Sequence, residues 1–297
     1  MTSRFSLIHF RLLTLFISMV FSSALLAKPV QNLMTETPAQ PQRVVSLNLC
    51  TDQLLMDMLP PDNLVGITQL SLDPALSYQY KKALAYSPHQ GRIEEIIALK
   101  PDLVITGEFT TQAINVLLEK LGYRVIQMGL PSTVTGIKQQ ILALGQHVGR
   151  PHQAAEMVSD LNLSLARLKH SRVSNKPTAA IYYANGFTAG KHTIANEALT
   201  LAGFKNIAAE KNLSFIAPLS MEALIEAQPE VLIFGRYLKN TDSLAHQVLT
   251  HPALRQFTHS SNVKTLSVPD KYWTCAGPSI IAAVAHLQDA YHQTKHP

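Results

Sequence analysis

One stretch of this chain occurs twice, and the repeat restricts the fold more than any other feature of the sequence. Residues 93–109, IEEIIALKPDLVITGEF, align without a gap to residues 221–237, MEALIEAQPEVLIFGRY, 128 positions later. Each copy is typical of a short helix, a turn at a proline, a buried strand and a glycine. A period of 128 residues is far too long for a solenoid, so the repeat predicts two related lobes.

The rest of the chain continues this alternation of strands and helices. Short apolar runs predict further buried strands at 43–47, 64–67, 125–128, 179–183 and 263–268. Amphipathic patterns predict helices from 51 or 52 to 59 and at 111–121, 134–148, 193–202, 244–249 and 279–293, and a longer one at about 152–168 between the two copies. The pattern indicates an α/β fold of two Rossmann-like lobes with mainly parallel sheets. The lobes are joined by the long helix, with a ligand cleft between them.

The first 27 residues have the composition of a secretory signal peptide. Arg4 and Arg11 supply positive charge, Leu12–Leu26 is mostly apolar, and small residues allow cleavage after Ala27. Fifteen helical residues rise only about 22 Å, less than the roughly 30 Å of a hydrocarbon core, which disfavours the alternative of an uncleaved membrane anchor. We therefore expect a cleaved signal, a flexible leader at residues 28–42 and a periplasmic mature chain.

The basic charge balance carries no functional signal. The chain has 25 Lys and Arg against 20 Asp and Glu, a formal charge of +5, and two of the surplus charges lie in the expected signal peptide. No basic run is longer than Lys81-Lys82, so the sequence offers no stripe that could follow a phosphate backbone. We expect no nucleic-acid partner.

Three motifs are similar to those of one known family. They are Arg43–Leu47 running into Thr51–Leu54, the block from Ile93 through Pro101 to Ile105, and Phe187–Lys191, FTAGK. Together they resemble the periplasmic substrate-binding proteins of ABC importers for iron chelates and cobalamin, the class with two lobes bridged by one helix. The resemblance covers about residues 43–293, almost the whole expected mature chain.

The resemblance implies an organisation and a set of partners. The N-terminal lobe would span residues 43–149, the bridging helix 150–172 and the C-terminal lobe 173–297. A monomer would capture a small-molecule chelate and deliver it to an inner-membrane ABC permease and its ATPase. The protein would need no cofactor of its own, because the metal arrives within the ligand.

Glu94 and Glu222 occupy matching places in the two repeat copies. In the family, such glutamates lie one per lobe on the docking face and meet arginines of the two permease subunits. The alternative is an ordinary solvated helix face. Ion pairs at a wet rim contribute only about 0.2–1 kcal/mol each, but they set orientation and encounter rate.

Six residues are candidates for contact with the ligand: four aromatic or histidine residues and the two cysteines, Cys50 and Cys275. Phe187, Tyr272 and Trp273 would give flat apolar walls to a bulky chelate, and His89 precedes the docking glutamate at the edge of the expected cleft. Core packing is the alternative for Trp273, and a neutral rim position is the alternative for His89. Weaker aromatic candidates are Tyr183, Phe215 and Tyr237.

Cys50 and Cys275 are the only cysteines, and each falls on a loop that we expect to face the cleft. In an exported protein, a disulfide between them would tie the lobes together. Two free thiols that contact the ligand or hold a soft metal, and two inert thiols, are the other possibilities.

The sequence thus favours a periplasmic receptor for a metal chelate. Cobalamin is slightly favoured, with a ferric siderophore or haem close behind. One alternative is a scavenger of zinc, manganese or another metal ion that uses Cys50, His89 and Cys275. An α/β enzyme is the remote alternative, because no H-E-x-x-H, G-x-S-x-G or complete phosphate-loop motif occurs. We therefore expect no catalytic residues and no metal site within the protein.

Overall fold

The computed structural model describes residues 40–110, 112–169, 173–183, 186–236, 251–260 and 263–293. The expected signal peptide, most of the leader, Tyr237 and the helix expected at 244–249 lie outside the described residues. None of the described helices is both long enough and apolar enough to cross a membrane.

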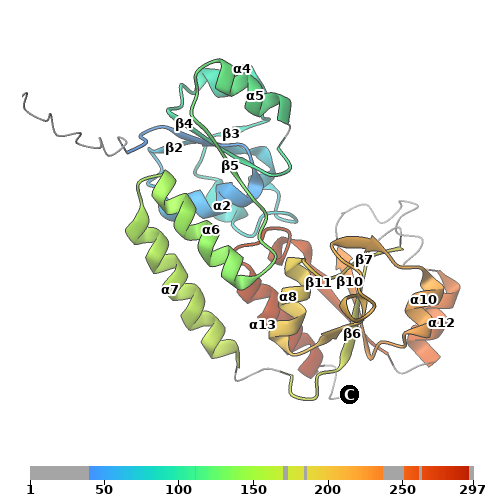
Figure 1. Ribbon diagram of the computed structural model, residues 1–297. Helices are drawn as coiled ribbons and strands as arrows, with labels where there is room; N and C mark the ends of the chain where they lie inside the picture. The colour runs from blue at the N-terminus through green and yellow to red at the C-terminus, as the bar shows by residue number, and fades with distance from the viewer. Residues whose placement is uncertain are drawn as a thin grey trace, which may run out of the picture. The chain divides into compact units, whose positions relative to one another are not determined.

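Five parallel strands form the sheet of the first lobe (Figure 1). In their order across the sheet they are β3 (Pro88–His89), β2 (Leu64–Thr68), β1 (Val44–Ser46), β4 (Leu103–Gly107) and β5 (Val125–Met128). The central strands β1 and β4 are buried along their whole length. Their sequences are mostly apolar, without alternation, because helices cover both faces of a parallel sheet.

Alternate side chains of these strands point to different helices, as the period of two of a strand requires. Val44 and Ile105 face α2 (Leu49–Met58) and α6 (Val134–His147) in one apolar cluster. Val45 and Val104 face α4 (Ile93–Ala98) and α5 (Gln112–Lys120) in another. Two short elements, η1 (Gln69–Leu72) and α3 (Tyr80–Ala83), connect β2 to β3.

The second lobe repeats this plan with a parallel sheet of four strands. Across the sheet they are β11 (Lys264–Pro269), β10 (Val231–Arg236), β6 (Thr178–Tyr182) and β8 (Lys205–Asn206). One face packs on α8 (Ile194–Ala202) and α13 (Ile280–Gln293), and the other on α9 (Ile207–Glu210), α10 (Met221–Glu226) and α12 (Pro252–Ser260). A short 3-10 helix, η4 (Asp270–Tyr272), follows β11.

The chain passes from the first lobe to the second through α7 (Pro151–Leu168), which lies beside α6 (Figure 1). Pro151 begins this helix, at a position where its missing N–H leaves no hydrogen bond unmade. Ala154 and Leu161 of α7 belong to the same apolar cluster as residues of α2, α6, α8 and α13. One continuous core therefore joins the inner faces of both sheets.

The sequence repeat is also a repeat of structure. Helix α4 and strand β4 start 128 residues before α10 and β10, respectively, and the two helices have the same length. Each helix is followed by a residue in the left-handed region, Lys100 with φ 47° and Gln228 with φ 43°, directly before the proline. The repeat therefore extends to the backbone of the turn, where a non-glycine residue rarely adopts this conformation.

An acidic side chain at the same repeat position fastens each sheet. Asp102 accepts hydrogen bonds from the backbone N–H groups of Gln42 and Arg43, at 2.7 and 3.1 Å. Glu230 accepts one from the N–H of Thr178, at 3.0 Å. Each carboxylate thereby caps the start of the strand next to its own.

One part of the second lobe departs from the parallel arrangement. Strands β7 (Phe187–Ala189) and β9 (Ile216–Pro218) form an antiparallel pair beside the main sheet. The sequence did not predict this pair, because three-residue strands show no periodicity and their partners lie 27 or more residues apart. Hydrogen bonds formed only in the folded chain decide such a pairing.

We predict that Asp102→Ala and Glu230→Ala each lower the free energy of unfolding by about 1–2 kcal/mol, because each removes a charged acceptor of backbone N–H groups. Urea denaturation measures the loss. Glu119→Ala on the exposed side of α5 is the matched control and should change stability by less than about 0.5 kcal/mol. Equal effects of the three substitutions would contradict the capping role.

Candidate functional site

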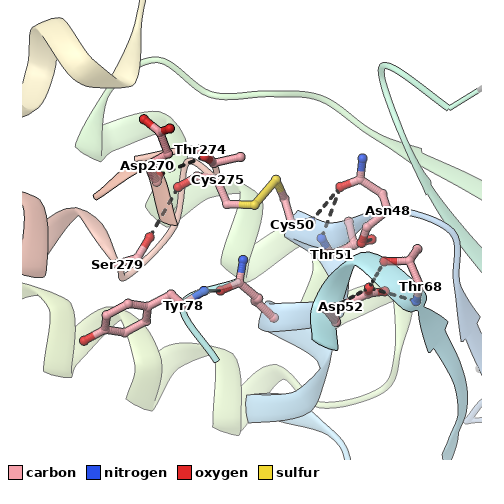
Figure 2. Close-up of a disulfide and its surroundings, with 12 residues drawn as sticks. Asn48, Cys50, Thr51, Asp52, Thr68, Tyr78, Asp270, Thr274, Cys275 and Ser279 are labelled. Carbon is pink, nitrogen blue, oxygen red and sulfur yellow. Dashed lines mark hydrogen bonds between the residues drawn. A yellow bond between two sulfur atoms is a disulfide. The ribbon is translucent and has the colours of Figure 1, made fainter. Parts of the chain in front are cut away.

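A disulfide joins the two halves of the chain (Figure 2). Cys50 lies in the first turn of α2, directly after β1, and Cys275 lies between η4 and α13, after β11. Their Cα atoms are 5.1 Å apart, although 225 positions separate them in sequence. The structure thus contains the disulfide among the alternatives that the sequence left open, and the alternatives with free thiols are wrong.

The disulfide shows which edges of the two sheets meet. Cys50 and Cys275 both follow the carboxyl ends of parallel strands. The loops at the carboxyl ends of the first sheet therefore lie against those of the second. In open α/β sheets this is the edge at which ligands bind, because loops and helix N-termini converge there.

Aromatic rings make further contacts between the lobes near this bond. The ring of Tyr272 meets the ring of Tyr78 edge to face, with centroids 5.8 Å apart. The ammonium of Lys271 lies 5.5 Å from the centre of the ring of Tyr80. Tyr272 is therefore held between Tyr78 and His286 of its own lobe, with a partly buried ring.

Trp273 belongs to the core instead of the surface. Its side chain is only 5% exposed and packs in the continuous core, and its indole N–H points to Asp270 Oδ1 at 3.5 Å. The prediction that Trp273 contacts a ligand does not agree with this placement, and the core-packing alternative does. In the sequence, the position of Trp273 shortly before a glycine-proline turn could not distinguish ligand contact from core packing.

His89 is also enclosed, at the end of β3. Its Nε2 hydrogen-bonds to the carbonyl of Ser46 at 2.9 Å, and its Nδ1 accepts from the N–H of Gly91 at 3.1 Å. Burial lowers the pKa of His89 below its ordinary value, which favours the neutral ring. Because both ring nitrogens are used within the lobe, His89 is not available as the ligand-binding residue that the sequence suggested.

Exposed apolar side chains gather instead on the antiparallel pair β7/β9. Phe187 is 39% exposed, Ile216 is 56% exposed and Phe215, next to β9, is 65% exposed. Phe187 lies opposite Pro218 in the ladder and Ile216 opposite Ala189, so the four side chains share one face. Phe215 precedes Ile216, so the alternation of a strand does not place it on that face, and its ring lies near that of His192. For their shared exposure, and not for a shared face, we call Phe187, Phe215 and Ile216 the second-lobe apolar platform.

The backbone is strained at Phe215 of this platform and at the neighbouring His192. Phe215 has φ 57° and His192 has φ 61°, and their rings approach to 5.8 Å between centroids. A bulky residue in the left-handed region costs energy and tends to persist where function requires its orientation. The sequence ranked Phe215 as a weaker candidate, since nothing in its neighbours reveals a positive φ.

The first lobe exposes apolar side chains at the corresponding edge. Phe109 follows β4 and is 78% exposed, and Leu130 follows β5 and is 44% exposed. The N–H of Leu130 donates to Glu108 Oε2 at 3.2 Å, which links the two loops. Phe109 is the last residue of the first repeat copy, and in the sequence alignment it matches Tyr237 of the second copy. This match of two aromatic residues could have identified Phe109 as a candidate for ligand contact.

A separate hollow runs along α5, away from the predicted site residues. It is lined by Gln112, Ala113, Val116, Leu117 and Lys120. Within the described ranges, no group of three or more His, Cys, Asp or Glu side chains is placed to hold a metal ion.

Comparison with known proteins places the chain in a family. The family model described as "Periplasmic binding protein" matches residues 44–266. The chain belongs to the periplasmic binding protein family.

Individual relatives and structures agree with this assignment. The chain is 24% identical to the "Cobalamin-binding protein" of Halobacterium salinarum over 86% of this chain and 71% of that protein. It is 26% identical to the "Vitamin B12-binding protein" of Photorhabdus laumondii over 84% of this chain and 87% of that protein. The "Periplasmic heme-binding protein RhuT" of Roseiflexus sp. RS-1 has a similar fold, with a TM-score of 0.71 and 23% identity. The match covers 85% of this chain and 98% of that chain.

This periplasmic binding protein exposes both glutamates of the repeat. Glu94 and Glu222 are each the second residue of their helix, α4 and α10. Hydrogen bonds from the backbone at the start of α10 and from Ser220 lower the pKa of Glu222 below its ordinary value. The carboxylate of Glu222 is therefore ionised and accessible on the surface of its lobe.

Asp52 is a buried acidic residue beneath the disulfide that the sequence did not single out (Figure 2). Its Oδ2 accepts hydrogen bonds from the N–H and hydroxyl of Thr68, at 2.9 and 2.6 Å, and from the hydroxyl of Ser71, at 2.7 Å. Burial raises the pKa of Asp52 from 3.8 to about 7, against the lowering effect of these donors and Ser46.

We predict that Asp52 makes the protein less stable as the pH rises. Between about pH 4 and pH 7 the native state keeps a proton that the unfolded state releases, so this group lowers the free energy of unfolding by about 1.4 kcal/mol per pH unit. Asp52→Asn should remove this slope, which urea denaturation at pH 5, 6 and 7 measures. The exposed Asp62→Asn is the control, and identical slopes in the three proteins would refute the assignment.

Proposed function

We propose that this protein captures a metal chelate between the carboxyl ends of its two sheets and delivers it to an ABC permease. The observation that carries the proposal is the exposure of large apolar side chains at those ends. They are Phe109 and Leu130 in the first lobe and the second-lobe apolar platform, Phe187, Phe215 and Ile216. Apolar walls suit a bulky planar ligand such as a corrin or porphyrin.

Cobalamin is the slightly favoured ligand, with haem or a ferric siderophore close behind. The names of the relatives from Halobacterium and Photorhabdus support a corrinoid. Solved structures of similar fold include heme-binding proteins and the "Vitamin B12 binding protein BtuF" of Vibrio cholerae, at a TM-score of 0.64 and 19% identity. Burying each phenylalanine contributes about 1.5–3 kcal/mol, so two or three rings supply much of a micromolar affinity.

Capture of a bare metal ion by Cys50, His89 and Cys275 does not fit the structure, because all three side chains are occupied. Cys50 and Cys275 are bonded to each other, and both nitrogens of His89 are hydrogen-bonded within the first lobe. We infer a binding role without catalysis and without a resident cofactor. The relatives above are binding proteins by name, which supports this inference.

We further propose that the protein works in the periplasm as a monomer, after removal of its signal peptide. The family description supports the compartment. The permease would contact Glu94 and Glu222, one in each lobe, and an ATPase would drive transfer through it. The equivalent helix positions of the two carboxylates support this arrangement, since a permease with two similar subunits could bind both lobes in the same way.

We predict that at least one of cyanocobalamin, haemin and a ferric siderophore binds below about 10 μM, roughly −7 kcal/mol. Phe187→Ala and Phe215→Ala should each weaken binding by about 10- to 100-fold, since each removes apolar area from the contact. Titrations followed by the absorption of the chelate test this. Leu163→Ala, at a 55% exposed position on α7, is the matched control. Failure of all three chelates to bind would refute the proposed ligand class.

We predict that Glu94→Lys and Glu222→Lys abolish transport but leave chelate affinity within about twofold, because they reverse the charge at the docking surface only. Uptake into proteoliposomes that contain the permease measures transport. Glu156→Lys, exposed on α7, makes the same charge change as a control and should leave transport intact. Loss of chelate binding in the two variants would show that these glutamates belong to the ligand site.

A further inference from the structure

The disulfide is placed to control how far the lobes separate. We propose that the Cys50–Cys275 bond is a clamp that holds the ligand-facing ends of the two sheets together. The clamp thereby slows the release of a bound solute, a consequence that rests on the proposed function. It joins segments 225 positions apart, one from each lobe.

The clamp is anchored firmly in the first lobe. The N–H of Cys50 donates to Asn48 Oδ1 at 2.8 Å, where Asn48 caps the start of α2. One turn of the same helix holds Asp52, which accepts hydrogen bonds from Thr68 at the end of β2 and from Ser71. These hydrogen bonds tie the first turn of α2, which contains Cys50, to the end of β2 (Figure 2).

In the second lobe, hydrogen bonds within a few residues of Cys275 hold the disulfide. Cys275 is 4% exposed, and its carbonyl accepts from the hydroxyl of Ser279 at 3.4 Å. The N–H and the hydroxyl of Thr274 both donate to the carbonyl of Asp270 at 2.8 Å. Because Asp270 directly follows β11 and Ser279 directly precedes α13, the bond connects the ends of strands and helices rather than mobile loops.

Noncovalent contacts also join the lobes, through the continuous apolar core and a hydrogen bond from the N–H of Val134 to Glu197 Oε1 at 3.0 Å. Contacts nearer the surface include the edge-to-face pair of Tyr78 with Tyr272 and the contact of Lys271 with the ring of Tyr80. Tyr78 is 44% exposed, so water competes for this surface. Contacts of this kind open and close thermally, whereas the sulfur–sulfur bond persists in an oxidising compartment.

Two covalent links between the lobes restrict their relative motion. One is the chain itself at α7, and the other is the disulfide. Two bodies joined at two points can twist about the line through those points but cannot swing apart at either one. Release of a solute from the clamped protein therefore proceeds by twisting or local loop motion.

The distance between the two lobes can be measured without a bound solute. Ala98 and Glu226 are exposed and occupy equivalent repeat positions, one in each lobe. Nitroxide labels on p-acetylphenylalanine at both positions leave the cysteines untouched. We expect the distance distribution from double electron–electron resonance to widen at least about twofold in the Cys50→Ser/Cys275→Ser variant. Coinciding distributions would overturn the clamp.

A chemical rescue separates the clamp from a general loss of structure. Reduced wild-type protein treated with diiodomethane gains a one-carbon bridge between the two sulfurs, and this should restore the narrow distribution. A distribution that stays wide would mean that the link is not the cause. If circular dichroism shows the serine variant unfolded, the same comparison is made in trimethylamine N-oxide, which favours the compact state.

Dissociation rates test the consequence for the solute. With cyanocobalamin or haemin as the probe, stopped-flow absorbance should show about tenfold faster dissociation from the serine variant, with a smaller change in association. Equal dissociation rates would overturn the role in solute release. Failure of both probes to bind counts against the proposed function, and the label distances then decide the clamp by themselves.

Discussion

The covalent bond between Cys50 and Cys275 is the constraint on which the candidate site depends. It sets the carboxyl ends of the first parallel sheet against those of the second, so that residues from both halves of the chain meet at one place. A disulfide that closes so long a loop also removes many conformations from the unfolded chain. The bond therefore stabilises the fold and, together with the continuous core, holds these surfaces against each other.

Burial divides the aromatic residues of this region into two groups. Trp273 fills the continuous core and Tyr272 packs between the lobes, so both stabilise the arrangement around the disulfide. Phe109, Phe187 and Phe215 remain exposed, although large rings are favoured in the interior. Exposed rings at the ligand-binding edge of two α/β sheets are typical of a surface that a ligand covers.

Much of the fold could be predicted because its signals are local. The apolar runs of β1, β4 and β10, the turn prolines and the helix periodicity all lie within a few residues of one another, and the repeat revealed both lobes. The site was less accessible to prediction. The enclosure of His89 depends on Ser46 and Gly91, and the exposure of Phe187 and Phe215 depends on a strand pairing of distant segments. No sequence window contains these partners.

The sequence by itself determined the two-lobe α/β plan, because hydrophobic periodicity and an exact 128-residue offset are properties of the chain alone. It also limited the cysteines to one possible disulfide. Only the tertiary structure decided that this bond forms, that Trp273 is buried and that Asp52 is a buried acid with a raised pKa. The physical reason is that pairing, burial and desolvation depend on what lies close in space, and residues 225 positions apart become neighbours only when both sheets have formed.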